Sequence, residues 1–122
     1  MSLNVSFNGD GETSRDFCFV DNAVQANLLA ATAAHEHKDQ IYNVACNART
    51  SLNQLFDKIA GELARLQVFY DKAPLYGDFR PGDVLHSQAD IDKAACWLGY
   101  NPTHSVADGL AGAMPWYRNR LQ

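Results

Sequence analysis

The sequence predicts a single α/β domain over residues 1–122, in which short strands alternate with about four helices. Residues 3–7 alternate apolar and polar side chains, as a half-buried strand does. Residues 51–66 instead repeat apolar side chains at the spacing of an amphipathic helix. With 47% hydrophobic and 20% charged residues, the chain has the composition of a folded globular domain with one modest core.

Charge and hydropathy exclude some kinds of partner, and the cysteine content indicates the cellular compartment. The net charge is −4, and the lysines and arginines are scattered, so we expect no nucleic-acid partner. No apolar run approaches the ~20 residues of a membrane span, and residues 1–20 lack a signal-peptide pattern. Three cysteines, Cys18, Cys46 and Cys96, suit free thiols in a reducing compartment, so we expect a cytoplasmic protein.

The N-terminal third predicts a strand, a sharp loop and a helix. A first strand is expected within residues 1–8, and the Asn-Gly and Asp-Gly pairs of residues 8–11 predict tight turns. A second strand is expected over residues 16–20, before a helix with Asp21 as its N-cap. The apolar positions at helical spacing in this helix are Val20, Val24, Leu28 and Ala31.

The middle of the chain contains the clearest helix. Residues 41–45 predict a short buried strand. Ser51 and Gln54 then form a capping box at the start of the helix. The helix carries one continuous apolar face, which we expect to be core: Leu52, Leu55, Phe56, Ile59, Ala60, Leu63 and Leu66.

The C-terminal third predicts a short strand around residues 75–76, a turn and two further helices. One helix is expected over about residues 90–98, with Gly99 ending it in the C-cap position. The last helix begins at Ser105, capped with Asp108. Pro115 lacks a backbone N–H, so we expect a kink or break there.

Two segments carry candidate binding residues. Arg15 follows the glycine-rich loop, and its planar donors match the paired oxygens of a phosphate or carboxylate. Arg80 and Asp83 share an Arg-Pro-Gly-Asp turn, where the carboxylate can accept hydrogen bonds from a ribose diol. The alternatives are a surface pair of Arg15 with Asp16 and a plain surface turn at residues 80–83.

Residues 9–22 and 80–90, in that order, resemble the nucleotide-sugar epimerases of the extended short-chain dehydrogenase/reductase family, in particular UDP-N-acetylglucosamine 4-epimerases. Residues 41–44 and 114–117 extend the resemblance over nearly the whole chain, but only to the C-terminal part of such an enzyme. The resemblance implies a small substrate-binding subdomain without the NAD-binding Rossmann part. It also implies that Arg15 and Arg80 bind the pyrophosphate of a UDP-sugar and that Asp83 binds the uridine ribose.

Ser87 bears on the identity of the sugar. In epimerases that prefer plain glucose or galactose, the position four after the turn aspartate is typically a bulky tyrosine. A serine there leaves room for an N-acetyl group, so the resemblance suggests a UDP-N-acetylhexosamine. The alternative role for Ser87 is the N-cap of the next helix, paired with Asp90. His86 is a weaker candidate, and His35 with His37 lacks the further ligands of a metal site.

The glycine turn that seats NAD in this family and its Tyr-x-x-x-Lys pair do not occur in the sequence. The chain alone is therefore expected to lack catalytic residues and to be inactive, with NAD as the cofactor of the full-length enzymes. Three hypotheses remain: the UDP-sugar-binding portion of an epimerase, a free-standing nucleotide-sugar-binding or protein-interaction module, or a folded remnant. We also expect a homo-oligomer that covers an exposed interdomain face.

Overall fold

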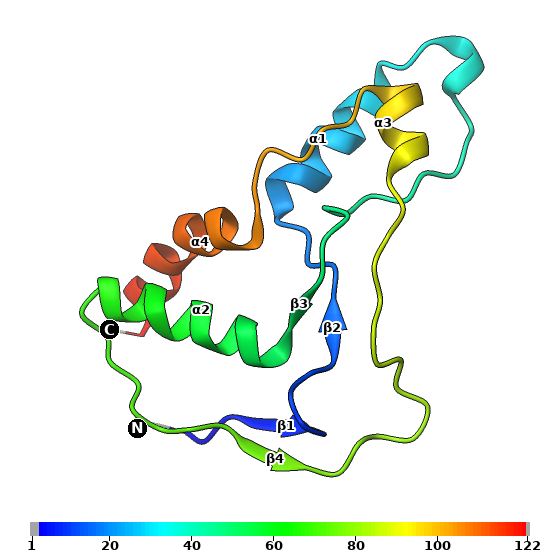
Figure 1. Cartoon of the computed structure of the whole chain (residues 1–122). Helices are drawn as coiled ribbons and strands as arrows, with labels where there is room; N and C mark the ends of the chain where they lie inside the picture. The colour runs from blue at the N-terminus through cyan, green and yellow to red at the C-terminus, as the bar shows by residue number, and fades with distance from the viewer. Residues whose placement is uncertain (1–2, 122) are drawn as a thin grey trace.

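The computed structural model of the chain describes residues 3–121, and Figure 1 shows the arrangement. Four helices and four short strands confirm the predicted α/β class. The elements are β1 (Ser6–Asn8), β2 (Ser14–Arg15), α1 (Val20–Ala31), the 3-10 turn η1 (His35–His37), β3 (Thr50–Ser51), α2 (Leu52–Arg65), β4 (Leu75–Gly77), α3 (Asp92–Leu98) and α4 (Val106–Arg120). Within residues 3–121, none of the helices is both long enough and apolar enough to cross a membrane.

The strands form two separate pairs. β1 pairs with β4 in parallel, with Phe7 opposite Tyr76, and the two strands run beneath α2 in Figure 1. β2 pairs with β3 in antiparallel fashion, with Arg15 opposite Thr50. Because β3 leads directly into α2, this second pair joins the glycine-rich loop to the start of that helix.

Local capping signals in the sequence are confirmed. Ser51 with Gln54 and Ser105 with Asp108 form complete capping boxes at the starts of α2 and α4. Gly99 ends α3 in the left-handed conformation, with a φ of 71°. Each of these features depends on neighbouring residues only, which is why sequence patterns predict them well.

The prediction for residues 16–20 is wrong. The strand is Ser14–Arg15, and Val20 already belongs to α1, whose N-cap is Phe19 without a side-chain bond. Asp21 lies in the first turn of the helix instead of at the cap. Strand pairing ends before Asp16, whose carboxylate accepts backbone hydrogen bonds from other segments, described below.

Residues 41–45 form no strand, which corrects a second prediction. Ile41 is 87% exposed, and only Ala45 of this segment is buried. The segment is held by side chains from elsewhere: the hydroxyl of Tyr100 donates to the carbonyl of Ala45 at 2.7 Å. The apolar composition had indicated burial, but no neighbouring strand pairs with this backbone within the described residues.

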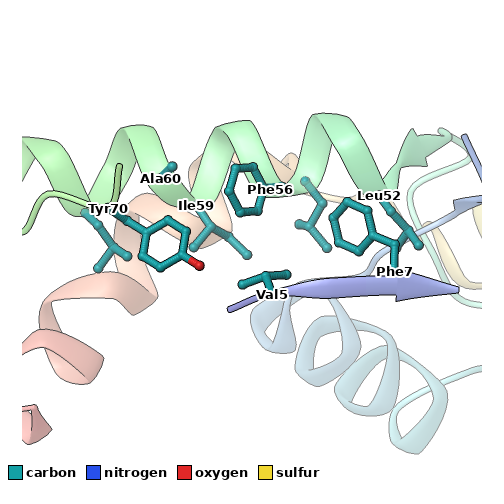
Figure 2. A pocket seen from close by; sticks show the side chains of 9 residues that line it. Val5, Phe7, Leu52, Phe56, Ile59, Ala60 and Tyr70 are labelled. Atoms are coloured by element: carbon teal, nitrogen blue, oxygen red, sulfur yellow. The ribbon is translucent and has the colours of Figure 1, made fainter. Parts of the chain in front are cut away.

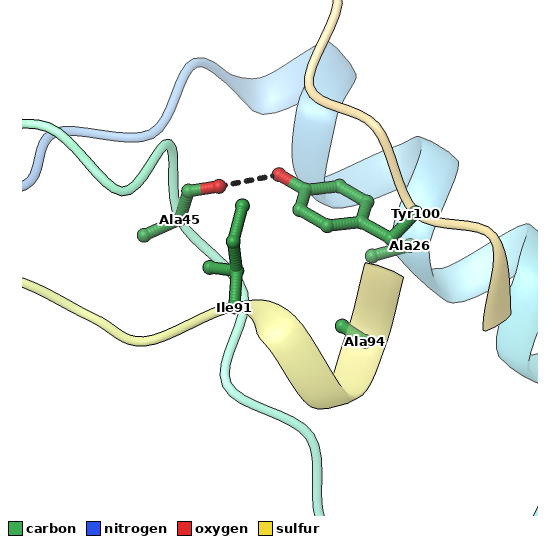
Figure 3. Packing of buried hydrophobic residues seen from close by; sticks show 5 residues of the cluster. All are labelled: Ala26, Ala45, Ile91, Ala94 and Tyr100. Carbon is green, nitrogen blue, oxygen red and sulfur yellow. Dashed lines mark hydrogen bonds between the residues drawn. The ribbon is translucent and has the colours of Figure 1, made fainter. Parts of the chain in front are cut away.

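The closed core lies at the end of the molecule that contains α1 and α3. Its buried hydrophobic residues, drawn in Figure 3, are Ala26, Ala45, Ile91, Ala94 and Tyr100. On α1 the buried residues are Asn22 and Ala26, whereas Val20, Val24 and Leu28 are 61%, 49% and 64% exposed. The predicted apolar stripe of this helix therefore faces outward.

The apolar face of α2 was predicted to be core, and this is only partly correct. No residue of α2 is buried, and the face lines an open apolar groove with β1, drawn in Figure 2. The groove contains Val5 and Phe7 on one side and Phe56 and Ile59 on the other, and Tyr70 closes one end. The edge-on contact of Phe7 with Phe56, at 6.2 Å between ring centres, joins the two sides.

Pro115 does not break the last helix. α4 continues through it from Val106 to Arg120. Gly109 and Met114 are buried along this helix, and the ring of Phe19 lies where a side chain at Gly109 would project. Packing against α2 and the loop before α1 thus outweighs the single backbone hydrogen bond that proline cannot make.

Candidate functional site

The structure gathers three of the four predicted site residues around one hollow. Arg15, Arg80 and Asp83 line it, together with Phe7 and Asn8 of β1 and other residues of the surrounding loops. The predicted residues come from segments that are far apart in the sequence, the glycine-rich loop and the Arg-Pro-Gly-Asp turn. The pairing of β1 with β4 brings these two segments together, because each strand leads directly into one of them.

Two glycines shape the loop at the edge of this hollow. Gly9 and Gly11 have φ values of 101° and 79°, a region that other residues rarely adopt. A side chain on Gly9 would collide with the ring of Phe79, and one on Gly11 would collide with the amide of Asn53. The positive φ on which the predicted turns depend is therefore present at both glycines, and residues 9–11 form a bend that approaches these neighbours closely.

Arg15 is half-buried and held in place. Its Nη1 donates to the carbonyl of Ser14 at 2.8 Å, and its backbone belongs to the β2–β3 pair. The alternative of a surface pair between Arg15 and Asp16 is not observed: the Asp16 carboxylate binds backbone N–H groups instead. The remaining N–H groups of the Arg15 guanidinium are suited to an anionic ligand.

Arg80 and Asp83 contact each other across their turn. Gly82 has a φ of 82°, and the N–H of Asp83 donates to the carbonyl of Arg80 at 3.2 Å. The guanidinium donates through Nε at 3.0 Å and through Nη2 at 3.2 Å to the two oxygens of Asp83. An arginine has five N–H donors and each carboxylate oxygen has two lone pairs, so this bidentate pair leaves both groups able to bind a ligand.

Ser87 is not among the residues that line this hollow. It is exposed, and its N–H donates to the carbonyl of Ser14, the residue before Arg15, at 3.1 Å. The neighbouring His86 contacts the Ser14 hydroxyl through Nδ1 at 2.8 Å. The alternative role of Ser87 as a helix N-cap is wrong, because α3 begins at Asp92 with Ile91 as its N-cap.

Sequence reasoning missed the residue that holds the site to the rest of the chain. The carboxylate of Asp16 accepts hydrogen bonds from the backbone N–H of Cys46 at 2.9 Å and from those of Ala48 and Ala89 at 3.3 Å each. Three segments distant in the sequence therefore meet at one side chain, directly beside Arg15. A single aspartate next to an arginine carries no local signal of such a role.

The sequence analysis also did not identify Asn22 as a residue that joins distant segments. It is fully buried, its Oδ1 accepts from the N–H groups of Thr103 at 2.9 Å and His104 at 3.1 Å, and its Nδ2 donates to the carbonyl of His104 at 2.8 Å. This side chain ties α1 to the connection between α3 and α4. The signal in the sequence was a polar residue among the apolar positions of a helix, which is more often solvent-exposed.

The remaining histidines form no metal centre. Within residues 3–121, no group of three histidine, cysteine, aspartate or glutamate side chains is placed to hold a metal ion. His37 lies on η1 with its ring 5.1 Å from that of Trp97. Gly109 and Gly112 lie inside α4, so they do not form a glycine turn at a helix N-terminus of the kind that seats NAD.

The chain is similar in sequence to known epimerases. Residues 2–45 match the model of the NAD dependent epimerase/dehydratase family. The chain is 33% identical over 117 residues to the UDP-glucose 4-epimerase of Mycolicibacterium smegmatis, covering 93% of this chain and 34% of that enzyme.

Solved structures show the same relationship. The UDP-glucose 4-epimerase of Thermotoga maritima, solved with UDP-glucose, superposes with a TM-score of 0.85 at 35% identity, over 98% of this chain and 36% of that one. The UDP-N-acetylglucosamine 4-epimerase of Methanobrevibacter ruminantium, solved with UDP-N-acetylmuramic acid, gives a TM-score of 0.77 at 30% identity, over 96% and 35%.

The chain spans about a third of the length of these relatives. Its fold is that of a fragment of an extended short-chain dehydrogenase/reductase epimerase. In sequence and in fold, the chain is therefore similar to one part of the NAD-dependent epimerases of that family.

Proposed function

We propose that these residues form the UDP-sugar-binding portion of a nucleotide-sugar 4-epimerase, with a UDP-N-acetylhexosamine as the substrate. The observation that carries this proposal is the convergence of Arg15, Arg80 and Asp83 on one hollow. Two guanidinium groups supply donors for the diphosphate, and the carboxylate accepts from the ribose hydroxyls. The relatives solved with UDP-sugars support the choice of ligand class.

The chemistry of epimerisation would come from elsewhere. Oxidation and reduction at C4 of the sugar require NAD, which supplies the hydride transfer in this family. The sequence contains neither the glycine turn nor the Tyr-x-x-x-Lys pair of these enzymes, so no catalytic step is assigned to these residues. The chain by itself is expected to bind the nucleotide-sugar without converting it.

Ser87 supports the choice of an N-acetylated sugar. Its backbone is fixed to Ser14, beside Arg15, and its side chain is small and exposed. A substrate whose diphosphate lies on Arg15 would place its sugar within reach of this position. The hydroxyl could then donate to an N-acetyl carbonyl, and the absence of a larger side chain leaves room for that group.

Calorimetric titration of the purified chain with UDP and with UDP-N-acetylglucosamine tests the binding site. Arg80→Ala is expected to weaken binding of both ligands about tenfold or more, since a hydrogen bond to a charged group contributes about 1.5–3 kcal/mol. Arg65→Ala is the matched control, because Arg65 also forms an exposed i,i+3 ion pair, with Glu62, but lies away from the hollow. Equal affinities in all three proteins would contradict the proposal.

The sugar assignment is tested with Ser87→Tyr in the same titration. The larger side chain is expected to weaken binding of UDP-N-acetylglucosamine while leaving UDP and UDP-glucose unchanged. An equal loss for all three ligands would show that position 87 does not recognise the N-acetyl group. Unchanged binding of all three would exclude it from the sugar site.

The exposed apolar residues favour a second possibility, in which the chain acts as a binding or interaction module that associates with itself. Val20, Val24 and Leu28 form an outward stripe on α1, and Ile41 is more exposed still. Exposed apolar stripes of this kind favour association. Light scattering at high micromolar concentration is expected to give the mass of a dimer or larger assembly, and a monomeric mass would contradict this.

A further inference from the structure

We propose that Asp16 is a positioning residue of the candidate binding site and makes that site selective for a nucleoside diphosphate over a monophosphate. Its carboxylate holds the segment that carries Arg15 and the segment that carries Arg80 in a fixed arrangement. Asp16 itself is not among the residues that line the hollow. The inference rests on the proposed function, because it assumes that the two arginines bind the phosphate groups of a nucleotide.

The separation of the two arginines depends on tertiary contacts, because they belong to distant segments. Arg15 lies in β2, Arg80 lies in the turn that follows β4, and both line the hollow. The pairing of β1 with β4 joins these segments before the turn. After the turn, residues 85–87 lie beside β2. The contacts on both sides of the turn therefore set the distance between the two arginine-bearing segments.

Ser14 and Asp16 make the contacts with the chain that follows the turn. The N–H of Ser14 donates to the carbonyl of Leu85 at 2.8 Å, and the carbonyl of Ser14 accepts from the N–H of Ser87 at 3.1 Å. Two residues further along each segment, the Asp16 carboxylate accepts from the N–H of Ala89 at 3.3 Å. The side chain of Asp16 thus extends the attachment that the backbone of Ser14 begins.

The same carboxylate also holds the segment that leads into the partner strand of Arg15. Its Oδ1 accepts from the N–H of Cys46 at 2.9 Å, and its Oδ2 accepts from that of Ala48 at 3.3 Å. These residues precede β3, whose Thr50 lies opposite Arg15. One side chain therefore connects the segment that pairs with Arg15 to the segment that follows the Arg80 turn.

Asparagine cannot replace all of these contacts. In Asp16→Asn the side chain keeps its size, but one of its two terminal groups becomes an NH2 donor. Either Oδ1 or Oδ2 is then lost as an acceptor, so at least one backbone N–H faces another donor. An N–H group left without an acceptor destabilises the arrangement that held it. We expect residues 46–48 and 87–89 to move relative to each other in this variant.

Binding of a diphosphate depends on this arrangement more than binding of a monophosphate does. Two phosphate groups bound by two guanidinium groups require those groups at a matching separation. A monophosphate needs only one of them, and UDP and UMP offer the same ribose hydroxyls to Asp83. The loss of UDP affinity relative to UMP affinity therefore measures the positioning, whereas general destabilisation of the fold lowers both affinities alike.

Calorimetric titration of the full chain with UDP and with UMP tests this role. Asp16→Asn is expected to weaken UDP binding about tenfold, as the loss of one charge-assisted contact does, and UMP binding by less than about threefold. Asp108→Asn is the matched control, because the Asp108 carboxylate also accepts a backbone N–H, that of Ser105, but does not line the hollow. This control should leave the ratio of the two affinities unchanged.

Hydrogen exchange followed by NMR is a second measurement, and it decides the question if Asp16→Asn does not fold. In the unsubstituted protein, saturating UDP should slow exchange of the Ala48 and Ala89 amide protons more than saturating UMP does. The reason is that only the diphosphate binds both arginines and so restrains the two segments that Asp16 joins.

The outcomes separate this inference from the proposed function. If the unsubstituted protein binds UDP but Asp16→Asn weakens UDP and UMP binding equally or not at all, the positioning role is wrong and the binding site remains supported. Equal protection of the two amide protons by UDP and by UMP would also overturn the positioning role. If the unsubstituted protein does not bind UDP, the proposed function fails and this inference fails with it.

Discussion

The two ends of this molecule differ in how completely their apolar side chains are buried. Around α1 and α3, Ile91, Ala94 and Tyr100 are buried, and polar side chains such as Asn22 have all their partners inside the fold. Around β1 and α2, the apolar face of the helix is only half-covered and borders an open groove. The candidate ligand-binding residues belong to the open end.

This difference indicates a division of roles. The closed end contains the buried hydrophobic cluster, so removing a side chain there should cost more stability than removing one from the open groove. The open end presents Arg80 and Asp83 on a surface turn, where the Arg80 side chain is 67% exposed. Asp16 connects the two ends, because it lies beside Arg15 and binds the backbone of residues 46, 48 and 89.

The largest loss of stability is expected when the buried side chain of Asn22, at the closed end, is removed. Asn22→Ala removes the partners of two N–H groups and one carbonyl in residues 103–104, and should lower the free energy of unfolding by about 3 kcal/mol. Urea unfolding followed by tryptophan fluorescence measures this. Asn27→Ala is the control, because Asn27 lies on the same helix but is exposed and bonds only to Ala23 of its own helix. Similar losses in both variants would contradict a special role for Asn22.

Truncating one isoleucine at each end compares how much buried side chains stabilise the two ends. Ile91 is buried in the closed core, and Ile59 lines the groove. Ile91→Ala should cost about 3 kcal/mol and Ile59→Ala about 1 kcal/mol, because a partly exposed side chain loses less buried surface and leaves no closed cavity. The same urea measurement gives both values. If Ile59→Ala costs as much as Ile91→Ala, the groove is covered in solution, for example by self-association.

The smallest effect on stability is expected from the Ser105–Asp108 capping box at the start of α4. Hydrogen bonds from the backbone and side chain of Ser105 lower the pKa of Asp108 below its ordinary value of 3.8. The ionised form is therefore favoured by folding, so its contribution is complete above pH 3.8 and is lost as the pH falls through the lowered pKa. Carboxyl titration by NMR should show the pKa of Asp108 rising toward its ordinary value in Ser105→Ala. An unchanged pKa would show that the hydroxyl does not contribute.

Features that depend on near neighbours could be predicted from the sequence. The two capping boxes, the C-cap at Gly99 and the turn at Gly82 involve contacts over three or four residues, and all are present. The candidate residues Arg15, Arg80 and Asp83 were chosen for their chemistry, and the fold places them around one hollow. Their binding roles stay predictions.

Features that depend on distant partners could not be predicted. Val20, Val24 and Leu28 have the spacing of a buried stripe, yet the buried face of α1 carries Asn22, whose partners are in residues 103–104. Residues 41–45 have the composition of a buried strand, but the described chain offers them no strand partner. Pro115 was expected to break α4, but helix packing keeps it continuous.

The sequence by itself therefore determined the α/β class, the two capping boxes, the C-cap at Gly99, the turn at Gly82 and the residue types suited to a UDP-sugar. Only the tertiary structure decided which helix faces are buried and that Asp16 and Asn22 join distant segments. The physical reason is the distance along the chain over which each kind of interaction acts. Backbone conformation at caps and turns is set within a few residues, whereas burial and long-range hydrogen bonds depend on which segments the whole chain brings together.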